Sequence, residues 1–141
     1  MIGIVENAKK VITYDLDKKQ NGVLIELYKD GEKTTAYFTT VLPGMFKGYH
    51  LHRVRVARYV ILRGKMKITL FRPGTQEKEE YVLDATNPQR LFIPKDIATG
   101  LLNVGSEEAW LINYPDPAYD PNFKDEQVEY TLEELENGMV K

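Results

Sequence analysis

The stretch Lys47-Gly48-Tyr49-His50-Leu51-His52-Arg53 decides most of what this chain can form. It contains both histidines of the 141-residue sequence. Residues at positions i and i+2 of an extended strand project from the same face, so we expect the two imidazoles side by side on one face of a sheet. Two imidazoles so arranged either bind a metal ion or place a base and a neighbouring group at one substrate atom.

Short β-type segments, separated by turn signals, surround this stretch. Alternation of apolar and polar residues and enrichment in β-branched and aromatic residues favour strands. We expect strands at residues 11–14, 23–28, 34–41, 65–71, 80–83, 90–93, 99–104 and 109–113, and one long extended stretch over 50–62. Residues 42–48 are expected to form a loop, and Asp30-Gly31 a hairpin turn. This spacing predicts an all-β sandwich or barrel.

Only the C-terminal tail has a helical pattern. Thr131 and Glu134 have the spacing of a capping box, and Asn137-Gly138 supplies a stop signal. Residues 114–121 are rich in proline and are expected to wrap irregularly over the surface of the barrel. The length of 141 residues predicts a single domain over residues 1–141.

Composition excludes several function classes. The sequence has no cysteine, which excludes disulfides, zinc-thiolate sites and thiol nucleophiles. Its net charge of −2 lacks the basic excess of a general nucleic-acid binder. No apolar run is long enough to span a membrane and no N-terminal stretch resembles a signal peptide, so we expect a cytoplasmic protein with no membrane partner.

Charge is distributed unevenly along the chain. Residues 47–72 contain lysines and arginines but no acid, whereas residues 125–136 contain acids but no base. A basic region beside the histidine pair suits an anionic ligand. The alternative is that these charges are solvated strand edges that resist aggregation.

Two motifs resemble those of the cupin superfamily. Gly48-x-His50-x-His52, followed by Gly64, resembles the first cupin motif, and residues 94–103 have the shape of the second. The resemblance covers residues 34–121. It implies a cupin-type jelly-roll β-barrel, the double-stranded β-helix, to which this chain adds a short C-terminal helix.

Departures from the metal-binding cupin pattern concern the metal ligands. A metal-binding cupin adds a glutamate shortly after the second histidine and another histidine in the second motif. Here Arg55 lies near the glutamate position and Thr99 stands at the histidine position. We therefore expect a site without a metal or other cofactor. The alternative is a two-histidine metal site completed by water or by an unexpected carboxylate.

Within the cupins, the stretch is similar to enzymes that modify nucleotide-activated sugars. Lys47-Gly-Tyr-His50 is similar to the Arg-Gly-x-His motif of the dTDP-4-dehydrorhamnose 3,5-epimerases, and residues 89–101 are similar to a further segment of that family. Residues 48–53 are also similar to the Gly-x-His-Ala-His-Lys motif of dTDP-sugar 3,4-ketoisomerases. The resemblance implies that His50 is the catalytic base and His52 a second active-site histidine.

Further candidate site residues accompany the histidines. Tyr37 is a candidate acid because the ketoisomerases use a tyrosine on this strand. Arg58 shares the parity of the histidines and is a candidate cation, and Lys47 is a candidate for substrate phosphate. Tyr114 and Tyr119 lie near the positions of sugar-contacting aromatics. Structural alternatives are core packing for Tyr37 and a solvated loop for Lys47.

Three functions remain open at this point. The first is an isomerase or epimerase of a dTDP-type 4-keto-6-deoxy sugar, acting by proton abstraction next to the ketone in polysaccharide or deoxysugar biosynthesis. The second is a non-catalytic cupin that binds a nucleotide sugar or another small anion, favoured because the epimerase lysine, tyrosine and second-motif histidine positions read Ala57, Ile112 and Thr99. The third is a metal-dependent cupin enzyme. We also expect a homodimer formed through residues 1–15.

Overall fold

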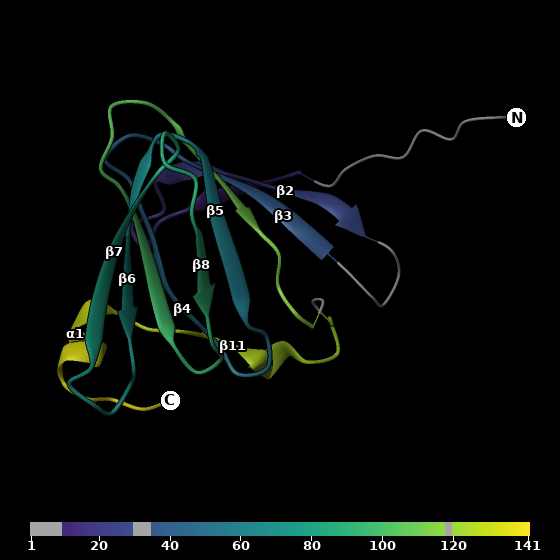
Figure 1. Ribbon diagram of the computed structural model, residues 1–141. Coiled ribbons are helices and arrows are strands. Elements are labelled where there is room, and N and C mark those ends of the chain that lie inside the picture. The colour runs from purple at the N-terminus through teal and green to yellow at the C-terminus, as the bar shows by residue number, and fades with distance from the viewer. Residues whose placement is uncertain (1–9, 30–34, 118–119) are drawn as a thin grey trace, which may run out of the picture.

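The computed structural model describes residues 10–29, 35–117 and 120–141, and its strands form two facing antiparallel sheets (Figure 1). One sheet has the strand order β1-β2-β3-β10-β5-β8 and the other β11-β4-β9-β6-β7. The first sheet comprises β1 (Lys10–Tyr14), β2 (Gln20–Lys29), β3 (Thr35–Val41), β10 (Ala109–Asn113), β5 (Ala57–Arg63) and β8 (Arg90–Ile93). The second comprises β11 (Gln127–Glu129), β4 (Phe46–His52), β9 (Ala98–Asn103), β6 (Lys65–Phe71) and β7 (Lys78–Asp84). The all-β prediction is confirmed.

The main core fills the space between the sheets. On β6, Met66, Ile68 and Leu70 alternate with residues of the other face, and all three belong to the core cluster. Strands of the facing sheet contribute further members of this cluster, among them Ile61 and Leu111. Side chains on the inner faces of both sheets therefore meet in one interior, as the period-two pattern of the sequence predicts.

A second, smaller core lies on the outer face of the sheet that contains β4. It consists of Leu51, Phe71, Ala98, Tyr130 and Leu135. Tyr130 and Leu135 come from the C-terminal segment, which runs past the lower ends of the strands and includes the helix α1 (Leu132–Glu136) (Figure 1). The C-terminal segment therefore covers part of the outer face of the sheet that contains β4.

The predicted C-terminal helix is confirmed, together with its capping box. The Thr131 hydroxyl accepts a hydrogen bond from the Glu134 N–H, and the Glu134 carboxylate accepts one from the Thr131 N–H. Gly138, just beyond the helix, has a φ of 72°, the left-handed conformation that glycine adopts readily.

The structure corrects three of the expected elements. Residues 46–48 belong to β4 rather than to a loop. The extended stretch expected over 50–62 is two strands in different sheets, because the chain leaves β4 after His52 and enters β5 at Ala57. The short strand β11, which pairs with β4, was not expected in a tail whose composition is mainly acidic. The turn at Asp30-Gly31 lies outside the described residues.

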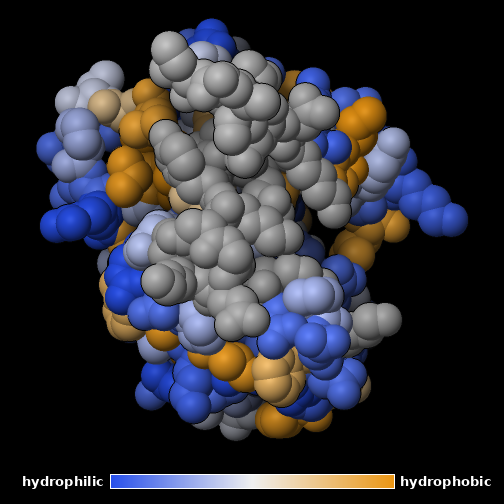
Figure 2. Space-filling view, turned by 90° about the vertical axis from the view of Figure 1, so that its right-hand side faces the viewer, coloured by the Kyte–Doolittle hydropathy of each residue, from blue (hydrophilic) through white to orange (hydrophobic). Residues whose placement is uncertain are grey.

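The outer surface is mixed in polarity. On the side that faces right in Figure 1, hydrophobic residues reach the surface on both flanks of the upper half, and hydrophilic residues with smaller hydrophobic patches lie below them (Figure 2). On the edge strand β1, Val11, Ile12 and Tyr14 are 40, 47 and 60% exposed. Within the described residues, no helix is long and apolar enough to cross a membrane.

A bulge in β4 sets which residues share its inner face. Lys47 pairs with Leu101 and His50 with Thr99, so Gly48 and Tyr49 together face the single residue Gly100. Gly48 has a φ of 143°, and a Cβ there would lie 2.8 Å from the Thr99 carbonyl oxygen and the Gly100 Cα. The bulge therefore requires glycine at position 48.

We predict that Gly48→Ala destabilises the protein by about 2 kcal/mol or more, since it combines an unfavourable φ with a backbone clash. Urea denaturation of both proteins measures this difference. Gly44→Ala is the matched control, because Gly44 also has a positive φ but a Cβ there meets no atom within 4 Å. Equal losses in the two variants would show that strain alone, and not the close approach of β9, constrains Gly48.

Candidate active site on the inner face of β4

Three polar side chains of the histidine stretch share the inner face of β4. His50 pairs with Thr99, and Lys47 pairs with Leu101, a member of the main core. Opposite residues of an antiparallel pair project to the same face, so Lys47 and His50 both face the interior. His52 lies two residues beyond His50 and shares this face. The two imidazoles therefore share one face of β4, as the sequence predicts.

A buried carboxylate from the C-terminal segment holds His52. Glu126 Oε2 lies 3.0 Å from His52 Nδ1 and 3.2 Å from Arg55 Nε, and its Oε1 accepts a hydrogen bond from the Arg55 N–H at 2.9 Å. Glu126 and Arg55 are both buried. The carboxylate only accepts hydrogen bonds, so it favours the tautomer in which His52 Nδ1 carries the proton and Nε2 has the lone pair. Arg55 Nη2 also approaches Nδ1, at 3.1 Å.

The pKa values of Glu126 and His52 are both lowered, which favours an ionised carboxylate and a neutral imidazole in their hydrogen bond. Burial raises the pKa of Glu126, but hydrogen bonds from Arg55 and His52 and their charges outweigh it and lower the pKa overall. Burial also lowers the pKa of His52, helped by the Arg55 charge and opposed by Glu126. An ionised Glu126 therefore faces a His52 that is neutral near pH 7.

His50 is less tightly held than His52. Its Nδ1 lies 3.5 Å from Gln127 Nε2 and 3.7 Å from Glu129 Oε1, both on β11. Burial lowers the pKa of His50, and the charges of His52 and Lys47 act in the same direction, while Glu129 opposes them. His50 is therefore a neutral imidazole near pH 7, half-buried and with one edge open to solvent, as a general base must be.

The Lys47 side chain is only partly buried, but its ammonium group is enclosed, which is unusual for a lysine. Its Nζ is shielded from solvent and has no hydrogen-bond partner among the described residues. Burial lowers the pKa of Lys47 from 10.5 to about 8. A buried ammonium group without a partner is costly in free energy, so its position calls for an explanation beyond packing.

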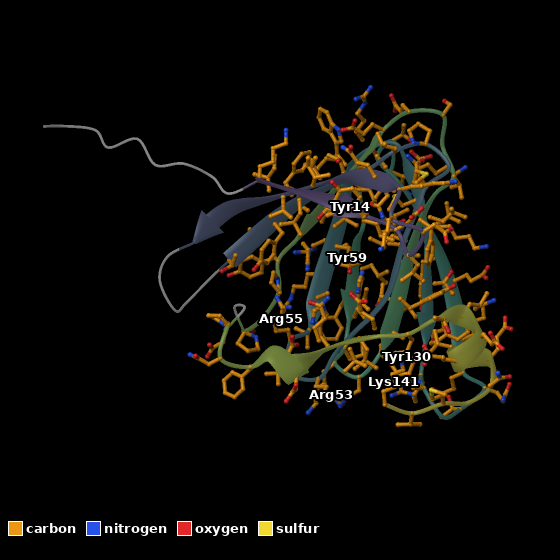
Figure 3. The ribbon with its side chains drawn as sticks, turned by 180° about the vertical axis from the view of Figure 1, so that it is seen from behind. Tyr14, Arg53, Arg55, Tyr59, Tyr130 and Lys141 are labelled. Atoms are coloured by element: carbon orange, nitrogen blue, oxygen red, sulfur yellow. The ribbon has the colours of Figure 1, made fainter. Side chains whose placement is uncertain are left out.

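The facing sheet contributes tyrosines to the same interior. Tyr37 on β3 and Tyr59 on β5 both pair with Asn113 of β10, so the three side chains form one cross-strand row. Tyr59 packs against the main core, and its burial raises its pKa to about 12. Figure 3 shows Tyr59 between the sheets above Arg55, whose charge acts on the Tyr59 hydroxyl.

Arg58, one of the predicted site residues, is not brought to the histidines. Arg58 lies on the outer face of its sheet, where its guanidinium is 5.6 Å from the centre of the Phe92 ring. The parity argument for Arg58 was wrong because the chain changes sheets between His52 and Ala57, so alternation cannot be counted across that break. Tyr114 follows β10 and is 45% exposed. Tyr119 lies outside the described residues.

Half of the eight lysines and arginines in residues 47–72 form ion pairs within the molecule. Arg55 pairs with Glu126, Arg63 with Glu107, Lys67 with Glu80 and Arg72 with Glu77. Arg53, just after β4, donates a hydrogen bond to the Lys141 carbonyl and so ties this end of the strand to the C-terminal tail (Figure 3). Within the tail, the Lys141 ammonium lies over the Tyr130 ring. Within the described ranges, no three histidine or carboxylate side chains converge to hold a metal ion.

Sequence reasoning missed Glu126 and Tyr59. Glu126 lies in an acidic run that has the composition of a solvated surface, and nothing local distinguishes it from its neighbours. One weak signal could have pointed to an ion pair with Glu126. Glu126 lies in a segment with acids but no lysine or arginine, whereas the histidine stretch has lysines and arginines but no acid. Tyr59 fell within the stretch that was expected to be continuous with the histidine strand.

The sequence is similar to a family of polysaccharide biosynthesis proteins and to two relatives named for glycan or polysaccharide biosynthesis. A family model described as the polysaccharide biosynthesis C-terminal domain matches residues 17–127. The chain is 26% identical over 120 residues to the probable low-salt glycan biosynthesis epimerase Agl13 of Haloferax volcanii, covering 77% of each chain. It is 26% identical over 129 residues to the spore coat polysaccharide biosynthesis protein SpsL of Bacillus subtilis, covering 84% of this chain and 83% of SpsL.

Solved structures show the fold. The capsular polysaccharide assembling protein CapF of Staphylococcus aureus matches with a TM-score of 0.75 at 19% identity, over 88% of this chain. Bacillus subtilis oxalate decarboxylase matches with a TM-score of 0.64 at 17% identity, over 79% of this chain. The chain spans 35% of the CapF chain and 28% of the decarboxylase chain. These neighbours are cupins, so the predicted cupin-type jelly roll is confirmed.

We predict that Lys47→Met raises the free energy of unfolding at pH 7 by about 1–3 kcal/mol, because each pKa unit corresponds to about 1.4 kcal/mol. The folded pKa of about 8 lies below the ordinary 10.5, so the unfolded chain binds more protons between these values. Stability of the unaltered protein should therefore rise from pH 8 to 10.5, and the advantage of the variant should shrink. Urea denaturation of the two proteins from pH 7 to 10.5 measures their free energies of unfolding and the difference between them. Equal stability of the two proteins at pH 7 would contradict the prediction.

We also predict that Glu126→Gln lowers the free energy of unfolding by about 3 kcal/mol at pH 7, because it breaks the buried ion pair between Glu126 and Arg55. The pKa of His52 should fall further, while that of His50 changes little. NMR titration resolves both, since the chain has only two histidines.

Glu129→Gln is the matched control for Glu126→Gln, because the Glu129 side chain is 64% exposed and lies 3.7 Å from His50. We expect it to change stability by less than about 0.5 kcal/mol. Equal effects of the two substitutions would show that Glu126 is no more important than a surface carboxylate.

Proposed function

The chain belongs to the polysaccharide biosynthesis C-terminal domain family of cupins, and on that premise we propose that it is a sugar isomerase or epimerase. We propose as its substrate a nucleotide-activated 4-keto-6-deoxy sugar of the dTDP type. The reaction begins when a proton is removed from a carbon next to the ketone. The observation that carries this proposal is the pair of neutral imidazoles, His50 and His52, on one inward-facing strand surface beside a lysine whose ammonium group is enclosed.

His50 is the base in this proposal. It is neutral near pH 7 and faces the interior, with its Nδ1 side toward β11. Removal of the proton breaks the C–H bond, forms an imidazolium on His50 and moves the bonding electrons toward the ketone oxygen as an enolate. Return of a proton to the opposite face of the carbon gives the epimer, and return to a different carbon gives the isomer.

His52 and Tyr37 are the proposed partners of His50. Glu126 fixes the His52 ring and favours the tautomer with a lone pair on Nε2, so His52 accepts or relays a proton at a defined position. Tyr37 lies on the inner face of the opposite sheet and is the proposed acid that returns the proton. Tyr114 and Tyr119 are proposed to contact the sugar nucleotide outside the reacting centre, and Arg58 is left without a catalytic role.

The relatives support this class of reaction. The name of the Haloferax volcanii relative includes glycan biosynthesis epimerase, and that of the Bacillus subtilis relative includes polysaccharide biosynthesis. Both are covered over more than three quarters of their length. The nucleotide and the keto sugar follow instead from the motif resemblance around His50.

Deuterium exchange tests the proposal. We expect the protein, incubated with dTDP-4-keto-6-deoxyglucose in heavy water, to introduce deuterium next to the ketone, as mass spectrometry of the sugar nucleotide detects. His50→Asn should slow this exchange at least about 100-fold, because general-base catalysis contributes that much.

Arg63→Gln serves as the control for His50→Asn, because Arg63 forms an exposed ion pair with Glu107 away from the histidines. It should exchange deuterium at the unaltered rate. Binding of the sugar nucleotide by the unaltered protein without any exchange would favour the alternative, a non-catalytic cupin that holds a nucleotide sugar.

We further propose that the chain forms a homodimer through β1. This strand is at the edge of its sheet and exposes Val11, Ile12 and Tyr14, so its unpaired backbone groups and apolar side chains suit pairing with a second copy. The part of the expected dimer segment before residue 10 lies outside the described residues.

Sedimentation velocity tests the dimer. We expect twice the chain mass of 16.3 kDa for the unaltered protein and a monomer for Ile12→Lys, which places a charge on the proposed interface. Leu62→Lys, at an exposed position near the end of β5, is the control and should remain dimeric. A monomeric unaltered protein, or a dimer of unchanged stability for Ile12→Lys, would contradict this interface.

A further inference from the structure

Lys47 carries an enclosed ammonium group that the described part of the fold does not use. Its Nζ has no hydrogen-bond partner among the described residues, whereas neighbouring members of the basic stretch, such as Arg55 and Lys67, are in ion pairs. Desolvation of an unpaired ammonium opposes folding, so a purely structural role would favour an apolar side chain at this position. The missing acceptor is therefore expected to come from a bound molecule.

Lys47 lies near His50 on the same strand face, so the acceptor for its ammonium group is expected on a molecule that also contacts His50. Their partners on β9, Leu101 and Thr99, are two residues apart, so the two side chains emerge about 7 Å from each other on one face. The Lys47 charge is close enough to lower the pKa of the His50 imidazole. A flexible four-carbon stem lets the ammonium group approach a substrate that contacts the imidazole.

We propose that Lys47 is a catalytic residue whose ammonium group binds the ketone oxygen of the sugar and stabilises the enolate formed when His50 removes the neighbouring proton. This inference rests on the proposed function and assigns the electrophilic partner of its base. The ketone oxygen and the acidic C–H belong to adjacent carbons, so one sugar ring reaches both groups.

Charge balance favours this assignment. During proton transfer the C–H bond breaks, the proton joins a ring nitrogen of His50, and the negative charge develops on the ketone oxygen. Lys47 stays protonated and opposes that charge in a water-poor interior, where such an interaction is strongest. When Tyr37 donates a proton to the carbon, the electrons return from the oxygen and Lys47 is unchanged. His50 then loses its proton to solvent, and the Tyr37 phenolate takes one from solvent, so that all three residues regain their starting states.

Protonation of Lys47 also agrees with a reaction near neutral pH. Its pKa of about 8 leaves the ammonium form in excess at pH 7, while His50 is in its base form. The rate should rise as His50 loses its proton and fall as Lys47 loses its own, which gives a bell-shaped profile. A bound anionic substrate favours the charged form of Lys47, so it would move the alkaline limb of the profile to higher pH.

The test compares Lys47→Met and Lys47→Arg with the unaltered protein in the deuterium-exchange assay. At saturating dTDP-4-keto-6-deoxyglucose, Lys47→Met should slow exchange about 100- to 1,000-fold, the loss typical of one oxyanion donor. Its affinity for dTDP alone, measured by calorimetry, should change less than about twofold, since the lysine contacts the sugar and not the diphosphate. Lys47→Arg should keep measurable exchange but lose the alkaline limb, because arginine stays charged.

The outcomes separate this inference from the proposed function. Undiminished exchange by a folded Lys47→Met overturns the role of Lys47 alone. Weaker dTDP binding with an unchanged exchange rate at saturation assigns Lys47 to phosphate and also overturns it. An alkaline limb that is unchanged in Lys47→Arg does the same. Absence of exchange by the unaltered protein overturns the proposed function and this inference together.

Discussion

The inner face of β4 depends on a one-residue mismatch between two strands. Gly48 and Tyr49 face Gly100 alone, so Lys47 and His50, three positions apart, project to the same side. In a regular strand they would project to opposite sides. Glycine at position 48 lets the two backbones approach, and glycine at position 100 leaves room for two rings, since a Cβ at Gly100 would lie 2.6 Å from the Tyr49 ring and 2.8 Å from that of Phe46. The chemistry proposed for Lys47 requires this local irregularity.

The C-terminal segment completes the other half of the site. It crosses the edge of the sheet at β11, packs Tyr130 and Leu135 against the outer face of β4, and delivers Glu126 to His52. The same carboxylate satisfies the backbone N–H of Arg55 where the chain passes between sheets. One buried acid therefore orients an imidazole and stabilises the crossing from β4 to β5. The position of the helix and the position of the base are linked through this segment.

The all-β class, most strands and the capped helix could be predicted because each depends on local pattern. Residues 65–71, 90–93 and 109–113 alternate or are β-branched, and they are strands with those bounds. The failures were non-local. Arg58 was placed by counting parity through a sheet crossing, and Lys47 was assigned to a loop because Gly48 resembles a turn signal. Glu126 comes from a segment that no sequence pattern connects to His52, and only the pairing of β11 with β4 brings it there.

The central claim is that a keto sugar lies between the His50 imidazole and the Lys47 ammonium on the inner face of β4. A crystal structure with dTDP-4-keto-6-deoxyglucose bound to His50→Asn tests this most directly. The account predicts that the ketone oxygen lies within hydrogen-bond distance of Lys47 Nζ and that a carbon next to the ketone faces residue 50. A sugar bound on the outer face, or a diphosphate in contact with Lys47 Nζ, would contradict it.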